Sequence, residues 1–294
     1  MRQLVITSGK GGTGKTTVTA SLVALAGEKV VADADVEAPN QHLLLNPQIM
    51  EKGEYKGAKM AIKDPKKCEQ CGKCEEYCRF NAIKDMEVDP TGCEGCGVCV
   101  FVCPTGALRL EEVTTGVTMV SKTDYGSFSH ALLEIGAEGS GKLVTEVRRN
   151  AEKILQDEPL LLIDGPPGIG CPVIASLTGT DLALIVSEPS VSGRHDLERI
   201  HQVTQHFGVD ALACINKWDL SPEMSKDIKK YCEDKGVNLV GKIPFDPEVM
   251  DVYKQGLPVE RLLKTKAGEA IEEIWDHVRE HLFNNKKSNI KEED

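Results

Sequence analysis

The most informative stretch of this 294-residue chain lies at its start and reads Arg2-Gln3-Leu4-Val5-Ile6-Thr7-Ser8-Gly9-Lys10-Gly11-Gly12-Thr13-Gly14-Lys15-Thr16-Thr17. Residues 2–8 form an apolar, β-branched run that is typical of a buried strand, and apolar side chains recur at helical spacing over residues 15–26. Between them, Gly9–Thr16 matches the pattern G-x-x-x-x-G-K-[ST]. Because this pattern follows a strand and begins a helix, it predicts a nucleotide-phosphate site in which backbone N–H groups and the helix N-terminus bind the anion.

The residues of this loop have distinct expected roles in binding a nucleotide. The glycines allow backbone N–H groups to approach the phosphate oxygens closely. The Lys15 side chain should reach the β- and γ-phosphates, and the Thr16 hydroxyl should bind Mg²⁺. The predicted nucleotide-binding residues of the loop are Gly11, Gly12, Thr13, Gly14, Lys15, Thr16 and Thr17.

Strand-like and helical runs alternate along the chain on both sides of a cysteine-rich segment. Val30–Asp33 is a short second strand in this pattern, and later strand-like runs cover residues 116–121, 160–164, 182–187, 211–216 and 238–243. Helical patterns separate these runs, for example over residues 141–155 and 222–235. This alternation predicts an α/β fold with a mostly parallel sheet and helices on both faces, and such sheets bind cofactors at the carboxyl ends of their strands.

The loop Lys10-Gly11-Gly12-Thr13-Gly14-Lys15-Thr16-Thr17 resembles the deviant Walker A motif of the MinD/ParA/Mrp ATPases. The resemblance implies a P-loop ATPase that uses ATP and Mg²⁺. It also implies that Lys10 crosses a nucleotide-bridged dimer and contacts the partner's ATP, where a cation stabilises the charge that develops on the γ-phosphate. We therefore expect a nucleotide-dependent homodimer, or a heterodimer with a related ATPase, and slow hydrolysis by the isolated chain.

Two further segments resemble the switch regions of the same family. Asp33-Ala34-Asp35, followed by Asn40, resembles switch I and implies that Asp35 orients the attacking water or a water bound to Mg²⁺. Leu160–Gly168 is an apolar strand that ends in Asp164 and continues into a rigid turn, as switch II does, so Asp164 should hold the Mg²⁺ shell. The predicted catalytic residues are Lys10, Lys15, Asp35 and Asp164, and the predicted Mg²⁺ residues are Thr16 and Asp164.

The residues that recognise the base leave two alternatives open. Asn216-Lys217-Trp218-Asp219 follows a strand and spells the N-K-x-D sequence with which many GTPases bind guanine. The ATPases that this chain resembles place an asparagine at the same strand end and close the adenine pocket with a later proline-containing loop, here around Pro244. Because the rest of the nucleotide site is of the ATPase type, we expect ATP, with GTP as the alternative.

Eight of the 11 cysteines form two identical runs, Cys68-x₂-Cys71-x₂-Cys74-x₃-Cys78 and Cys93-x₂-Cys96-x₂-Cys99-x₃-Cys103. This is the spacing of bacterial two-cluster ferredoxins, in which the fourth cysteine of each run binds the other cluster. Zinc ribbons use separated C-x₂-C pairs instead, and the lack of an export signal disfavours disulfides. The expected ligands are Cys68, Cys71, Cys74 and Cys103 for one [4Fe–4S] cluster, and Cys78, Cys93, Cys96 and Cys99 for the other.

The two runs differ in the residue that follows the last cysteine. Pro104 follows Cys103, whereas Arg79 follows Cys78. A positive charge near a cluster favours its reduced, more negative form, so we expect unequal reduction potentials.

These motifs divide the chain into three parts. Residues 1–62 and 113–285 should form a discontinuous ATPase domain, and residues 63–112 should form a small α+β ferredoxin-like insert that depends on its clusters for folding. The last residues, 286–294, are highly charged and are expected to be disordered.

Composition narrows the classes of partner. A formal net charge of −11 and only 4% aromatic residues are unfavourable for nucleic-acid binding. No apolar run reaches 18 residues, and the start of the chain lacks a secretory signal, so we expect a cytoplasmic protein without a transmembrane helix. A final helical stripe over residues 267–282 carries an acidic opposite face that anionic lipid would repel, so this helix should pack on the sheet rather than insert into a membrane.

Three functions fit this combination of motifs. The first is an ATPase whose dimerisation gates electron transfer through two [4Fe–4S] clusters to a protein acceptor. The second is an Mrp-like carrier that delivers clusters to an acceptor, although no C-x-x-C pair follows Cys103. The third is a MinD-like positioning ATPase in which the insert senses redox state.

Overall fold

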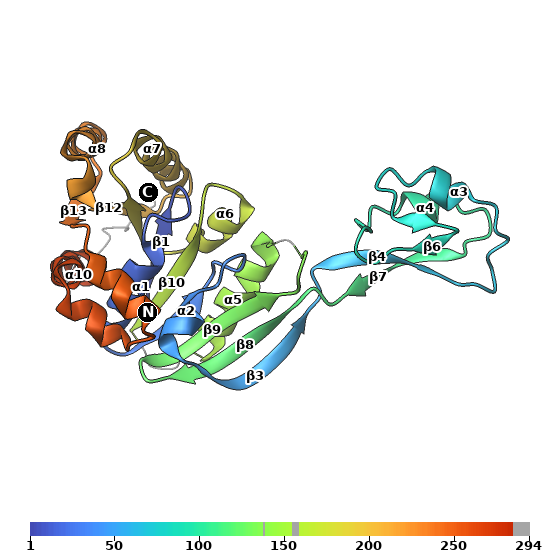
Figure 1. Ribbon diagram of the computed structural model, residues 1–294, viewed down its shortest axis with the longest axis horizontal. Coiled ribbons are helices and arrows are strands. Elements are labelled where there is room, and N and C mark those ends of the chain that lie inside the picture. The colour runs from blue at the N-terminus through green and yellow to red at the C-terminus, as the bar shows by residue number, and fades with distance from the viewer. Residues whose placement is uncertain (138, 155–158, 285–294) are drawn as a thin grey trace, which may run out of the picture. The chain divides into compact units, whose positions relative to one another are not determined.

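A computed structural model describes residues 1–137, 139–154 and 159–284. The chain divides into two compact units, drawn together in Figure 1. The larger unit contains Met1–Lys52, Thr118–Ala131 and the described residues from Gly139 onward, and the smaller unit contains Gly53–Val117 and the described part of 132–138. The charged tail at 286–294 lies outside the described residues.

The larger unit is built on a nine-stranded sheet in the described part of the chain, with the order β13-β12-β11-β1-β10-β2-β9-β8-β3. The strands are β1 (Arg2–Ser8), β2 (Lys29–Asp33), β3 (Gln48–Tyr55), β8 (Gly116–Thr123), β9 (Gly126–Leu133), β10 (Leu160–Pro167), β11 (Leu182–Ser187), β12 (Asp210–Asn216) and β13 (Asn238–Ile243). Every pair from β13 to β9 is parallel. The predicted α/β fold with a mostly parallel sheet is therefore confirmed.

Helices cover both faces of this sheet, as Figure 1 illustrates. One group, formed by α1 (Lys15–Leu25) and α10 (Lys266–Asn284), packs on one face together with α2 (Gln41–Leu45), α9 (Pro247–Lys254) and the 3₁₀ segment Val259–Lys264. The other group comprises α5 (Gly141–Ile154), α6 (Cys171–Leu177), α7 (Val191–His206) and α8 (Pro222–Lys235), with the 3₁₀ turn Trp218–Leu220 beside α8. Because both faces are covered, the central strands contain continuous apolar runs, and Leu4, Val5 and Ile6 are fully buried.

The final helix packs on the sheet as predicted. Ile271, Ile274 and Val278 on α10 are almost completely buried against the core that contains α1 and β13. Its apolar stripe is thus used within the fold. In the described part of the chain, no helix combines the length and the apolar composition needed to cross a membrane.

The smaller unit holds two short antiparallel pairs and two short helices. Strand β4 (Ala58–Lys63) pairs with β7 (Leu108–Val113), and β5 (Ile83–Lys84) pairs with β6 (Glu87–Val88). Helices α3 (Lys73–Glu76) and α4 (Val98–Val102) each begin within one cysteine run. Its small core includes Ala61, Ile83 and Leu108 together with the buried cysteines Cys74 and Cys99. The unit is wider than residues 63–112 because β4 and β7 pair in the register that starts at Ala58 and ends at Val113.

Candidate functional site

A cavity of about 420 Å³ lies over the loop between β1 and α1 in the larger unit. Its volume is typical of a pocket for a small ligand. It is lined by eleven of the residues that the sequence places at the nucleotide, namely Lys10, Gly11, Gly12, Thr13, Gly14, Lys15, Thr16, Thr17, Asp35, Asn216 and Pro244. The Thr13 hydroxyl is buried in this wall and has no hydrogen-bond partner among the described residues, so it is free to bind a ligand.

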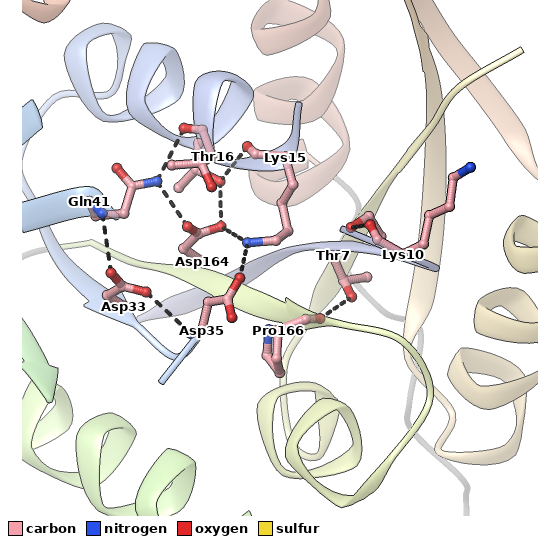
Figure 2. Close-up of polar contacts among 11 residues, drawn as sticks. Thr7, Lys10, Lys15, Thr16, Asp33, Asp35, Gln41, Asp164 and Pro166 are labelled. Carbon is pink, nitrogen blue, oxygen red and sulfur yellow. Dashed lines mark hydrogen bonds and ion pairs between the residues drawn. The ribbon is translucent and has the colours of Figure 1, made fainter. Parts of the chain in front are cut away.

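Lys15 lies at the centre of a buried charged cluster beside the cavity (Figure 2). Its Nζ donates a hydrogen bond to Asp164 Oδ1 at 2.7 Å and lies 3.2 Å from Asp35 Oδ2. Thr19 Oγ1 donates to the same Asp164 oxygen at 2.9 Å. The ends of β2 and β10 are neighbours in the sheet, and this pairing brings the two predicted switch carboxylates to one lysine of the phosphate loop.

Burial and repulsion perturb the ionisation of this cluster. Burial, followed by repulsion from Asp164, raises the pKa of Asp33 well above its usual value. Burial also raises the pKa of Asp35, although the nearby Lys15 ammonium opposes this shift. Burial alone would lower the pKa of Lys15, but attraction to Asp164 and Asp35 outweighs it and the pKa is raised.

Three carboxyl groups and one lysine thus form one buried cluster, in which Lys15 pairs with two of the three, Asp164 and Asp35. The acidic groups outnumber the lysine, and their carboxylate oxygens, like the neighbouring Thr16 hydroxyl, are ligands that Mg²⁺ accepts together with water and phosphate. The described residues contain no group of three or more His, Cys, Asp or Glu side chains arranged to hold a metal ion. A Mg²⁺ ion fits here because it needs only one or two protein ligands when a nucleotide supplies the rest.

Gln41 belongs to this cluster, although nothing in the sequence pointed to it. The residue begins α2 and is fully buried. Its Nε2 donates hydrogen bonds to Asp164 Oδ2 at 3.0 Å and to the Thr16 carbonyl at 3.2 Å, and its backbone N–H donates to Asp33 Oδ2 at 3.3 Å. A glutamine is not a typical metal or phosphate ligand, so only its place after Asn40 could have drawn attention to it.

Lys10 points away from the Lys15 cluster (Figure 2) and pairs with the start of α7. Its Nζ lies 2.6 Å from Glu188 Oε1 and donates a hydrogen bond to Ser192 Oγ at 2.7 Å. Burial would raise the pKa of Glu188, but the hydrogen bond and charge of Lys10 hold it below its usual value. Lys10 is therefore held by its own chain, with about a third of its side chain exposed.

Another part of the cavity wall joins the phosphate loop to the predicted base-binding segment. Asn216 Nδ2 donates a hydrogen bond to the Thr13 carbonyl at 2.7 Å. Asp219 Oδ1 accepts one from the backbone N–H of Phe245 at 2.7 Å, so this carboxylate holds the loop that contains Pro244. Tyr253, which the sequence did not single out, also lines the cavity, and its hydroxyl lies 2.8 Å from Thr17 Oγ1.

The eight clustered cysteines line two separate cavities in the smaller unit. One cavity is lined by Cys68, Cys71, Cys74 and Cys103. The other is lined by Cys78, Cys93, Cys96 and Cys99. Each cavity thus combines the first three cysteines of one run with the last cysteine of the other.

All eleven cysteines of the chain lie within the described residues and are free thiols, so no disulfide joins the two runs. The backbone N–H of Ala107 donates to Cys103 Sγ at 3.3 Å. At the second cavity, the Arg79 guanidinium lies 5.0 Å from the centre of the Phe80 ring, and Phe80 lines that cavity. The surroundings of Cys103 and Cys78 therefore differ in hydrogen bonding and charge.

Comparison with known proteins agrees with the geometry of the larger unit. Residues 4–259 match the CobQ/CobB/MinD/ParA nucleotide binding domain. An uncharacterized protein of Methanocaldococcus jannaschii is 32% identical over 95% of this chain and 97% of its own length. An iron-sulfur cluster carrier protein of the same organism is 26% identical over 97% of this chain and 86% of its own length.

A solved structure has the same fold as the chain. The septum site-determining protein MinD of Pyrococcus horikoshii OT3, complexed with Mg-ADP, matches with a TM-score of 0.56 at 19% identity, over 94% of this chain and 95% of that one. The family match covers most of the chain, from the phosphate loop to the segment that follows α9. The chain therefore belongs to the CobQ/CobB/MinD/ParA nucleotide-binding family, whose MinD and ParA members are ATPases.

Proposed function

We propose that this protein is a MgATP-dependent ATPase in which ATP-driven dimerisation gates electron transfer through two [4Fe–4S] clusters. The observation that carries the cluster half of the proposal is the division of eight cysteines into two cavities of four. A cluster of this type takes up and gives one electron at a time, and each of its four irons is bound by one thiolate. Four cysteines therefore need not converge on a single point, in contrast to the ligands of a single zinc ion.

The nucleotide half of the proposal rests on the cavity in the larger unit. Thr16 and Asp164 would hold the Mg²⁺ shell, while Asp35, which lies next to Lys15, would orient the attacking water. The phosphates would compete with the carboxylates for the Lys15 ammonium and draw it toward the cavity. Asn216 and the Pro244 loop would close on the base. Asp219, the residue that would bind guanine in an N-K-x-D motif, already accepts a hydrogen bond from the Phe245 backbone N–H, and this favours adenine over guanine.

Lys10 would supply the second cation of the reaction. In the isolated chain it is paired with Glu188 and Ser192, which turns its side chain away from the Lys15 cluster. Dimerisation would replace this ion pair by a contact with the γ-phosphate of the partner's ATP, where developing negative charge is largest. Hydrolysis would then depend on the dimer, so the rate per chain should rise with protein concentration.

The cluster assignment is tested by anaerobic reconstitution and iron analysis. We expect about eight irons and eight sulfides per chain. Cys103→Ser and Cys68→Ser should affect the same cluster, because both thiols line one cavity, and Cys78→Ser should affect the other. Cys171→Ser is the matched control, since Cys171 is an exposed free cysteine outside both sets. The double variant Cys68→Ser/Cys103→Ser should still bind about four irons, because both thiols line one cavity, and a protein that loses all eight would contradict the assignment.

A second candidate function is delivery of iron–sulfur clusters to other proteins. It is favoured by the similarity to the iron-sulfur cluster carrier protein of M. jannaschii. It predicts a labile cluster that moves intact to an apo-acceptor, whereas the electron-transfer proposal predicts that both clusters stay bound while electrons move. Incubation with an apo-ferredoxin, followed by iron analysis of the separated proteins, distinguishes the two.

A further inference from the structure

One residue connects the three segments that surround the proposed phosphate and Mg²⁺ site. Gln41 donates from its side chain to Asp164 in β10 and to Thr16 in α1, and from its backbone to Asp33 at the end of β2. The orientation of its amide is settled by chemistry, because Nε2 faces two acceptors and an oxygen in its place would be repelled by both. Figure 2 shows Gln41 between Thr16, Asp33 and Asp164.

The two oxygens of Asp164 depend on different donors. Oδ1 accepts from Lys15 and Thr19, whereas Oδ2 accepts from Gln41. If Lys15 turns toward bound phosphates, Asp164 loses its only cationic donor among the described residues. Gln41 and Thr19 then remain to fix the carboxylate, and Gln41 alone of these two residues contacts Oδ2.

Gln41 also contains a buried acceptor that a purely structural residue would not need. Its Oε1 has no hydrogen-bond partner among the described residues, although the side chain is fully buried. An apolar side chain of similar length would fill the same space without an unpaired oxygen. A buried polar atom without a partner calls for an explanation, and a role in a ligand site is one such explanation.

We infer that Gln41 is a positioning residue that holds Asp164 in place for Mg²⁺ and couples the bound MgATP to α2. The inference rests on the proposed MgATP site and is independent of the clusters. Because Gln41 begins α2, any movement of Asp164 that breaks its bond to Nε2 also loosens the start of this helix. The chain then continues through β3 into the smaller unit, so α2 is the first element after the site on the path to the cysteines.

The test measures Mg²⁺ dependence separately from nucleotide binding. Fluorescent N-methylanthraniloyl-ATP is bound to the full-length wild-type and Gln41→Met proteins in EDTA, and Mg²⁺ is then titrated. We expect Gln41→Met to bind the nucleotide within twofold of wild type in EDTA. The Mg²⁺ concentration at half-saturation should rise about tenfold, since the variant loses a hydrogen bond to a charged acceptor.

Hydrogen exchange of the α2 backbone supplies a readout that does not depend on activity. In wild type, adding Mg²⁺ to the ATP complex should slow exchange in residues 41–45, and this increment should disappear in Gln41→Met. Gln3→Met is the matched control, because Gln3 is also a buried, hydrogen-bonded glutamine but pairs with Arg148 and Glu152 away from the site. It should lower thermal stability and leave the Mg²⁺ titration unchanged.

The outcomes separate the inference from the proposed function. If the wild type binds no nucleotide or gives no Mg²⁺ response, the proposed MgATP site is wrong. If the wild type responds and Gln41→Met has the same Mg²⁺ half-saturation, or a change no larger than that of Gln3→Met, the inference is overturned. If Gln41→Met does not fold, Gln41→Asn is measured instead, since its amide is one methylene shorter and should weaken the Mg²⁺ response by a smaller factor.

Discussion

Three glycines of the phosphate loop provide a graded test of how tightly this loop is packed. A Cβ at Gly14 would lie 2.1 Å from Asn216 Nδ2, and the residue has a φ of +91°. Gly12 has a φ of +82° but nothing within 4 Å of the added atom, and Gly11 has neither constraint. Alanine at the three positions therefore separates steric overlap from backbone strain.

The magnitudes follow from these differences. The left-handed backbone costs an L-residue roughly 1–2 kcal/mol, and alanine recovers about 0.4–1 kcal/mol by restricting the unfolded chain. Gly12→Ala should thus lower the free energy of unfolding by about 1 kcal/mol. Gly14→Ala adds about 1–3 kcal/mol of overpacking against Asn216, for a total of about 2–4 kcal/mol. Gly11→Ala should stay within about 0.5 kcal/mol of wild type.

The assay is urea unfolding followed by tryptophan fluorescence in the absence of nucleotide. Both tryptophans of the chain, Trp218 and Trp275, lie in the larger unit, so the signal reports the unit that contains the loop. Equal destabilisation by all three substitutions, or a Gly14→Ala protein as stable as Gly11→Ala, would refute the reasoning, because neither result depends on the contact with Asn216.

Three further predictions concern other groups of the chain. Lys10→Ala should leave ATP binding and stability nearly unchanged, because its ion pair with Glu188 is partly exposed, but should lower steady-state ATP turnover on the order of 10³-fold; full turnover would exclude a lysine acting across the dimer. Burial lowers the pKa of His130 to about 4, so as pH falls the unfolded chain takes up a proton on this residue before the folded chain does. The contribution of neutral His130 to the free energy of unfolding is therefore fully present above about pH 6.5, and about 3 kcal/mol is lost as pH drops toward 4. His130→Gln should reduce this pH dependence, which urea unfolding at several pH values measures. Arg79→Gln should make the potential of the cluster in the Cys78 set more negative by on the order of tens of millivolts in a redox titration, and an unchanged potential would remove Arg79 as a source of asymmetry.

The sheet and its helices were predictable because buried strands and helices have recognisable patterns of apolar residues in the sequence. The first five residues of β11 and the first four residues of β10 form continuous apolar runs, and the predicted helices at 141–155 and 222–235 are found as α5 and α8. The phosphate loop was equally clear, since its glycines and Lys15 follow a fixed local pattern. Local patterns of this kind need no knowledge of distant contacts.

Other features depend on contacts between residues that are far apart in the chain, and no local sequence pattern indicates them. Gln41 reaches Asp164 across 123 positions, and Lys10 reaches Ser192 across 182. The pairing of β4 with β7, which widens the smaller unit beyond the cysteine runs, depends on residues on either side of both runs. The grouping of the cysteines around two cavities could be predicted only because their spacing is typical of ferredoxins in which two runs share two clusters; the clusters themselves stay a prediction.

The central claim is that MgATP and the clusters are coupled, and an anaerobic redox titration monitored by electron paramagnetic resonance tests it most directly. The reconstituted wild-type protein is titrated with and without MgATP, with Lys15→Ala as the control that should lose the nucleotide response. The account predicts two [4Fe–4S] signals whose midpoint potentials shift when MgATP is bound. Potentials that are identical in the two titrations, at saturating nucleotide, would contradict it.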